Sequence, residues 1–479
     1  MLSALIFLPL AGLLLIPFLR GHRAPALVSL VVTLATLALS IVMMMGYDAS
    51  ADGFQFLEDQ PLIAAFGISY KLGLDGISYW MVMVTTVLFP LVVLGSYTSV
   101  TERAGGYYAS LLILETGVLG AFLSLDLFLF YIFWEIMLVP MFFIIGIWGG
   151  KDRVYATVKF VLFTMSGSLL MLVAILYVAN EAGTFDYTVM LENRIGTTAQ
   201  YWAFVAFALA FIIKVPVFPF HTWLPDAHTE APTGGSVILA AILLKLGTYG
   251  LIRFNLTLFP EASHYFAPLM IILGVIGILH GAMAAAVQAD MKRLIAYSSV
   301  SHMGFIILGI FTFTVSGLQG SLIQMVNHAI STGALFFLIG MMYDQTHTRK
   351  MADYGGMAGV VPVLATIWFI SSMSSVGLPG LNGFVGEFII LMTTFQTHWL
   401  LGIFATTGVI LSAWYLLKLF GKVFFGPVTN EAMKQVKDLN VRQLVVLLPL
   451  VFFMFYIGVY PKPFFNAMGP SIEKNILRY

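Results

Sequence analysis

The chain has 479 residues, of which 60% are hydrophobic and 10% charged, and its formal net charge at pH 7 is +0. Its mean hydropathy of +0.95 excludes a soluble globular protein and indicates a polytopic membrane protein. The balanced charge gives no support to a nucleic-acid partner. Because the chain has no cysteine, disulfides, cysteine-bound zinc and cysteine-bound iron–sulfur clusters are excluded.

Apolar runs of membrane-spanning length follow one another along the chain, so we predict an all-α membrane protein with about 14 transmembrane helices. The predicted spans are 2–19, 25–46, 76–100, 107–124, 127–148, 154–179, 201–220, 234–255, 266–288, 294–315, 318–342, 358–397, 399–425 and 441–460. The first run lacks a basic segment before it, which favours a span over a signal peptide. The longest polar connection is Tyr47 to Asp75.

Lys and Arg residues gather on one side of the predicted spans. Most of those outside the spans fall in loops that follow odd-numbered spans, for example Arg103, Lys151 and Arg349. Positively charged loops stay on the cytoplasmic side of a membrane. We therefore expect both termini on the outer side, which agrees with an even number of spans.

Two parts of the chain repeat one pattern. The seventh span carries Lys214, is broken by Pro216 and Pro219, and precedes a span with LLKL at 243–246. The twelfth span is broken by GLPGLNG at 377–383, carries Glu387, and precedes a span with LLKL at 416–419. An odd number of spans separates the two parts, so they are expected to be inverted in the membrane. Broken helices at matching positions of inverted halves are typical of transporters and mark the ion path.

Ionisable side chains inside apolar spans are costly and favour a function in ion movement. Glu135, Lys214, Lys245 and Glu387 are the strongest candidates in the sequence. The alternative role for Glu135 is a structural hydrogen bond between helices. The alternative role for Glu387 is to stabilise the start of its helix through the helix dipole. Lys159 lies near one end of its span, so either a function or a lysine that reaches the membrane surface explains it.

The histidines allow two interpretations. His302 and His328 lie in adjacent spans beside Ser and Asn residues, which suits a proton path but also hydrogen-bonded packing. His221 and His228 flank the broken seventh span, whereas His280 stands alone in an apolar span and is expected to be structural. The chain has no P-loop, so ATP is not expected to drive transport.

Several motifs resemble the antiporter-like membrane subunits of bacterial respiratory complex I, of the NuoM type. They are KVPVFPFHTWLPDAHTEAPT, LLKLGTYGLIRF, WEIMLVPM, SSVSHMGF and LPGLNGFVGEF. The resemblance implies N-terminal spans 1–3 at 1–106, inverted five-helix units at 107–255 (spans 4–8) and 256–425 (spans 9–13), and a last span at 426–479. It extends to cation/proton antiporter subunits of the Mrp type, which stay as the alternative.

The resemblance also implies roles for individual residues. Glu135 and Lys214 match an ion pair, Lys245 a central relay lysine, His302 and His328 connecting histidines, and Glu387 an exit-side carboxylate. Possible accessory residues are Lys159, His221, His228 and Glu115, of which Glu115 matches no motif of the family.

The implied activity is proton translocation by a non-redox subunit of NADH:quinone oxidoreductase in a bacterial cytoplasmic membrane. This chain is expected to bind no cofactor or metal, whereas the whole complex implies NADH, FMN, iron–sulfur clusters and quinone. The expected partners are lipid and other membrane subunits, especially two flanking antiporter-like subunits in a hetero-oligomer.

Overall fold

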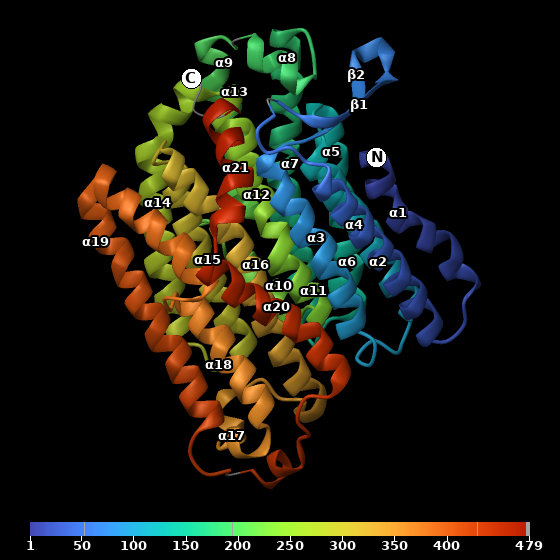
Figure 1. The fold of residues 1–479 in the computed structure, drawn as a ribbon, viewed down its shortest axis with the longest axis vertical. Helices are drawn as coiled ribbons and strands as arrows, with labels where there is room; N and C mark the ends of the chain where they lie inside the picture. The colour runs from blue at the N-terminus through green and yellow to red at the C-terminus, as the bar shows by residue number, and fades with distance from the viewer. Residues whose placement is uncertain (52, 194, 429, 476–479) are drawn as a thin grey trace.

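A computed structural model describes residues 1–51, 53–193, 195–428 and 430–475 as a bundle of helices with one small β-hairpin (Figure 1). The first half contains α1 (Leu2–Leu15), η1 (Ile16–Phe18), α2 (Arg23–Met45), β1 (Gln55–Ile63), η2 (Ala64–Phe66), β2 (Ile68–Leu74), α3 (Gly76–Gly95), α4 (Ala104–Leu123), α5 (Leu127–Ile136), α6 (Leu138–Trp148), α7 (Arg153–Ala182), α8 (Tyr187–Glu192), α9 (Thr197–Lys214), α10 (Trp223–Glu230), α11 (Thr233–Ile238), η3 (Leu239–Leu243), α12 (Leu244–Gly250), η4 (Leu251–Asn255) and α13 (Leu256–Leu258). The second half contains α14 (Pro260–Ala286), α15 (Met291–Ile310), α16 (Val315–Thr346), η5 (Met351–Asp353), α17 (Met357–Val360), α18 (Pro362–Val376), α19 (Asn382–Phe424), η6 (Glu431–Gln435), α20 (Val441–Val459) and α21 (Lys462–Asn475).

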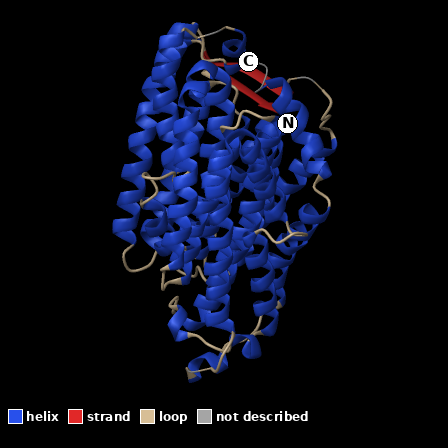
Figure 2. Cartoon of the chain, turned by 90° about the vertical axis from the view of Figure 1, so that its left-hand side faces the viewer, coloured by secondary structure: helices blue, strands red, loops and turns tan. Residues whose placement is uncertain are grey.

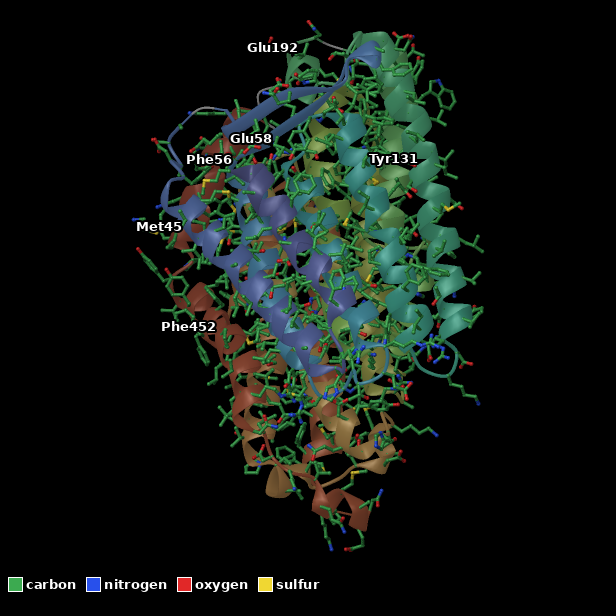
Figure 3. All side chains as sticks on the ribbon, turned by 90° about the vertical axis from the view of Figure 1, so that its right-hand side faces the viewer. Met45, Phe56, Glu58, Tyr131, Glu192 and Phe452 are labelled. Atoms are coloured by element: carbon green, nitrogen blue, oxygen red, sulfur yellow. The ribbon has the colours of Figure 1, made fainter. Side chains whose placement is uncertain are left out.

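Twelve of the described helices are long and apolar enough to cross a membrane, and two shorter apolar helices, Leu2–Phe18 and Pro362–Val376, accompany them. Large apolar side chains cover the outside of the bundle, as at Met45 and Phe452, which project outward (Figure 3). This inverts the usual polar surface of a soluble protein, because lipid rather than water surrounds the helices. The chain is therefore an integral membrane protein.

The polar connection between the second and third predicted spans folds into an antiparallel hairpin, which the sequence analysis did not predict. Strands β1 and β2 pair from Gln55 opposite Leu74 to Ile63 opposite Ile68. Figure 2 shows the hairpin at one end of the bundle, and α1 begins and α21 ends toward the same end (Figure 1). Asp75 ends the hairpin and caps α3, since its carboxylate accepts hydrogen bonds from the main-chain N–H groups of Ile77 and Ser78.

Both predicted helix breaks are present. Helix α9 ends at Lys214, and the chain runs irregularly through 215–222 before α10 begins at Trp223. Helix α18 ends at Val376, where Gly377 has a φ of 85°, and α19 begins at Asn382. A left-handed glycine at this position ends a helix without steric cost. Helix α19 is itself kinked at His398, between the twelfth and thirteenth predicted spans.

The most buried helices form the centre of the bundle. The 18-residue apolar cores of the candidate spans Thr233–Leu258 and Val315–Thr346 are wholly buried, and that of Met291–Ile310 is nearly so. The first of these contains two π-helical turns, η3 and η4, which lie on either side of α12. Turns of this kind are rare and are often found at functional sites.

Candidate functional site

Lys245 lies at the centre of the bundle, on α12 between the two π-helical turns, with 1% of its surface exposed. Its Nζ donates a hydrogen bond of 2.6 Å to the carbonyl oxygen of Ala240, in η3. The same Nζ lies 2.5 Å from Nδ1 of His328, on α16. A buried lysine needs such partners, because an ammonium group without them is costly in a low-dielectric interior.

His302 and Glu387 form a second buried contact. Nδ1 of His302, on α15, donates to Oε1 of Glu387, on α19, over 2.7 Å. Nε2 of Gln324 donates to the same oxygen over 3.0 Å, and Nε2 of His302 lies 3.1 Å from the hydroxyl of Ser375. Each ring nitrogen of His302 therefore has a partner. A histidine needs two such partners to accept a proton on one nitrogen and donate one from the other.

A short gap separates these two contacts. The ring centroids of His302 and His328 are 5.7 Å apart, and Nε2 of His328 has no hydrogen-bond partner among the described residues. A polar cavity of about 10 Å³ lies beside both rings, which is room for about one water molecule. Lys245, His328, His302 and Glu387, here named the central cluster, thus form a row that one water molecule would complete.

Hydrogen bonds from neighbouring helices hold the break beside Glu387 in place. Oδ1 of Asn382 accepts from the hydroxyls of Ser374 and Ser331, the latter over 3.3 Å. The side chain of Asn327 donates to the carbonyl oxygen of Asn382 over 2.7 Å. Side chains of α16 and α18 thereby tie the start of α19 to its neighbouring helices.

Lys214 and Glu135 do not form the ion pair that the resemblance implies, although they are electrostatic neighbours. No salt bridge joins them in the described part of the chain. Nζ of Lys214 instead lies 5.1 Å from the ring centre of Trp134 and 5.8 Å from that of Phe160. The ammonium faces aromatic rings because Trp134 precedes Glu135 on α5 and turns its indole toward α9, an arrangement that attracts cations.

The accessory residues fall into separate groups. Nζ of Lys159 lies 2.7 Å from Oδ2 of Asp226, whose other oxygen is 3.1 Å from Arg293, so Lys159 is ion-paired. His221 contacts His280 with 3.0 Å between their Nε2 atoms. His280 is therefore not the isolated histidine that its sequence context indicates, because the broken span folds back onto α14.

Two accessory residues lack polar side-chain partners. The ring of His228 stacks on that of Phe336 with centroids 4.8 Å apart, and neither of its nitrogens has a partner among the described residues. Glu115 is fully buried on α4, and its two carboxyl oxygens also lack partners in the described chain. Glu115 is thus not connected to the central cluster.

Several polar residues of the site escaped the sequence analysis. Gln324, Asn327 and Asn382 are uncharged and lie among apolar neighbours in the sequence. The serines at 371–375 could have been found only because several of them cluster within one predicted span. A bidentate ion pair was also missed: Arg253 donates to Asp75 over 2.8 and 2.5 Å, and both side chains are buried. Asp75 and Arg253 lie far apart in sequence at predicted span ends, where charges are common.

The fold and this geometry define a polytopic membrane protein of the antiporter-like class, with ionisable groups buried along its centre. Residues 124–412 match the family described as NADH:quinone oxidoreductase/Mrp antiporter, transmembrane. The chain belongs to this family, and the resemblance seen in the sequence is confirmed.

Curated relatives match over the full length. NADH-quinone oxidoreductase subunit M of Rhodobacter capsulatus is 42% identical and covers 100% of this chain and 97% of its own. Subunit M of Mycobacterium tuberculosis is 40% identical, with 99% and 94% covered. A chain of respiratory complex I from Thermus thermophilus has a TM-score of 0.92 and 33% identity, covering 100% of this chain and 99% of its own. A chain of the Mrp complex from a Dietzia species has a TM-score of 0.87 and covers 99% and 98%, but at 21% identity it shows the fold alone.

Proposed function

We propose that the protein is a proton-translocating subunit of a bacterial NADH:quinone oxidoreductase. The observation that carries the proposal is the row from Lys245 through His328 and His302 to Glu387, buried at the centre of an antiporter-like fold. The full-length identity of 42% to a subunit M supports the complex I assignment over the Mrp alternative, which rests on likeness of fold.

Protons would move along the central cluster by exchange between neighbouring groups. Lys245 gives a proton to the nitrogen of His328 2.5 Å away, a water molecule bridges to His302, and Glu387 receives the proton over 2.7 Å. Proton transfer needs donor and acceptor within hydrogen-bond reach, which both direct contacts satisfy.

Lys214 and Glu135 would act as the electrostatic input. A carboxylate near a lysine favours the charged form of that lysine. When the carboxylate moves or is screened, the charged form of Lys214 is no longer stabilised. A proton, or an electrostatic effect, is then passed toward Lys245.

We propose about 14 spans, with a first five-helix unit ending at α13 and an inverted second unit ending with α19. The count joins α5 with α6, α9 with α10, and α18 with the first part of α19. The outward-facing end is then the end with the β-hairpin, and both termini lie there.

The chain would carry no redox centre of its own. Flavin, iron–sulfur clusters and quinone would belong to other subunits, whose redox energy reaches this chain through charge shifts. Two antiporter-like subunits would flank it in the membrane, and lipid would cover the remaining apolar surface.

The proposal is tested by purifying the tagged chain in mild detergent and identifying its partners by mass spectrometry. We expect co-purification with flavin- and iron–sulfur-containing subunits, and NADH-driven proton pumping after reconstitution into vesicles. Co-purification with cation/proton antiporter subunits alone would favour the Mrp alternative. A chain that purifies by itself would contradict both.

A further inference from the structure

Arg253 lies on the hairpin side of Lys245, in the π-helical turn η4, and the central cluster does not include it. It follows Lys245 by eight residues, with Tyr249 halfway between them. A spacing of four residues places side chains along one face of a helix, and eight residues advance the helix by about 12 Å. The fold thus provides a row of polar side chains that leads from the central lysine toward the hairpin end of the bundle.

The ion pair between Arg253 and Asp75 ends this row. Arg253 donates to both oxygens of Asp75, over 2.8 and 2.5 Å, and both side chains are buried. One of these oxygens also accepts from two main-chain N–H groups at the start of α3. Nε of Arg253 donates to the hydroxyl of Tyr249 over 3.1 Å, and this hydroxyl donates to the carbonyl oxygen of Phe122 over 2.9 Å. Hydrogen bonds therefore hold the pair and the tyrosine in one arrangement.

Aromatic rings from three separate elements cover the guanidinium. Cζ of Arg253 lies 5.2 Å from the ring centre of Phe54, just before the hairpin strand β1. It lies 5.8 Å from the ring centre of Tyr187, on α8, and 5.3 Å from that of Tyr249, on α12. Such rings attract a cation while they present little polar surface. Arg253 is thus a fixed charge in a dry, enclosed place.

The chemistry of arginine decides what this row can do. An arginine side chain keeps its proton in a protein, whereas lysine and histidine side chains exchange theirs. Beyond the ion pair lies the half-buried Tyr47, within electrostatic range of Asp75 and just past the end of α2. With an exchangeable group in place of Arg253, the row would continue from Tyr249 to the hairpin end of the bundle.

We propose that Arg253, held by Asp75, is a proton-insulating residue that closes the first five-helix unit on the outer side. A proton on Lys245 then leaves only through His328 and the central cluster. The inference rests on the proposed function and adds to it the residue that prevents protons from flowing back. A pump needs such a barrier, because a continuous polar row between the two sides of a membrane would dissipate the gradient. A fixed positive charge also opposes the passage of protons.

A purely structural role of the ion pair is the alternative, because breaking a buried pair destabilises a protein. The substitution Arg253→Lys separates the two roles, since lysine keeps the positive charge beside Asp75 but can release its proton. Passive proton entry is measured with a pH dye inside vesicles that contain the assembled complex, after an acid pulse and without NADH. We expect it to be several-fold faster for Arg253→Lys than for the wild type. The matched control is Arg442→Lys, at an arginine that donates to the carbonyl oxygen of Leu94 at the other end of α3, and it is expected to keep the wild-type permeability.

A double variant, Asp75→Asn with Arg253→Met, tests whether proton exchange or loosened packing causes the leak. Neither new side chain titrates, and asparagine can still cap α3. Replacing a buried ion pair by uncharged groups is often neutral for stability. We expect vesicles with this variant to be as tight as those with the wild type. A double variant that leaks as fast as Arg253→Lys would show that packing is responsible, and the insulating role would be refuted.

A measurement on the wild-type complex does not depend on whether the variants assemble. All residues of 249–258 are buried, so hydrogen–deuterium exchange of peptides from this segment is expected to be slow. Exchange as fast as that of the exposed loop around Ser50 would place water beside Arg253 and overturn the proposal.

The outcomes also separate this inference from the proposed function. If the wild-type complex pumps, and assembled Arg253→Lys is as tight to protons as the wild type, the insulating role is refuted and the proposed function stands. If the wild-type complex assembles without pumping protons, the proposed function fails and the inference with it.

Discussion

Replacing Glu387 by glutamine tests the last contact of the central cluster. The amide is nearly isosteric with the carboxylate, and its oxygen still accepts a hydrogen bond from His302 or Gln324, so the break between α18 and α19 is expected to persist. What the substitution removes is the negative charge 2.7 Å from Nδ1 of His302.

The magnitude follows from the strength of that contact. A hydrogen bond to a charged group contributes about 1.5–3 kcal/mol, and one between neutral groups about 0.5–1.5 kcal/mol. The contact between His302 and the side chain at position 387 therefore weakens by about 1–1.5 kcal/mol, a factor of about 5 to 13 in an equilibrium constant. If every proton passes through His302, the rate of pumping is expected to fall by a similar factor.

The assay is NADH-driven acidification of vesicles that contain the purified complex, with NADH oxidation followed in parallel. The control is Glu192→Gln, at an exposed glutamate on α8 at one end of the bundle (Figure 3). Subunit composition by mass spectrometry checks that both variants assemble. An assembled Glu387→Gln complex that pumps at the wild-type rate would show that protons do not leave through this contact.

Three further predictions can be tested by substitution. Lys245→Met should slow pumping in the vesicle assay more than His328→Gln does, because water can replace an imidazole but not a charge. Equal rates in the two variants would contradict the greater importance of the lysine. Asp75→Asn should lower the thermal midpoint of the purified complex, since unpairing the buried Arg253 costs about 3–5 kcal/mol; an unchanged midpoint would mean that the ion pair does not stabilise the fold. Gly247→Val should reduce the yield of assembled complex, because a Cβ there would come within 2.7 Å of a main-chain oxygen of α9 and overpacking costs about 1–3 kcal/mol; a normal yield would show that α9 and α12 can separate at little cost.

The sequence predicts the elements that depend on composition and local geometry. Long apolar runs mark the spans, and the prolines at 216 and 219 and the glycines at 377–383 mark the two breaks. The in-span charges at Lys214, Lys245 and Glu387 stand out because lipid makes each of them costly.

The contacts between distant helices could not be predicted in the same way. The pairing of His221 with His280 depends on how the broken span folds back onto α14, which no local pattern encodes. Lys292 lies next to Arg293, just outside the predicted span 294–315, yet it is buried. The β-hairpin was missed because Gln55–Ile63 mixes charged and apolar residues without clean alternation.

The two π-helical turns around α12 make the residue count of this helix matter as much as its composition. Each wider turn holds an extra residue, and a helix advances about 100° per residue. Deleting one residue from η3 would let this wide turn close into a regular α-helix, and because the turn holds one extra residue, the segment beyond would keep its phase and Lys245 its direction toward His328. Deleting one residue from η4 would likewise close that turn and leave Lys245 in place. Single-residue deletions should therefore be tolerated better in these two turns than in the regular turns of the same helix, and a scan of such deletions would trace the phase of the helix independently of side-chain chemistry.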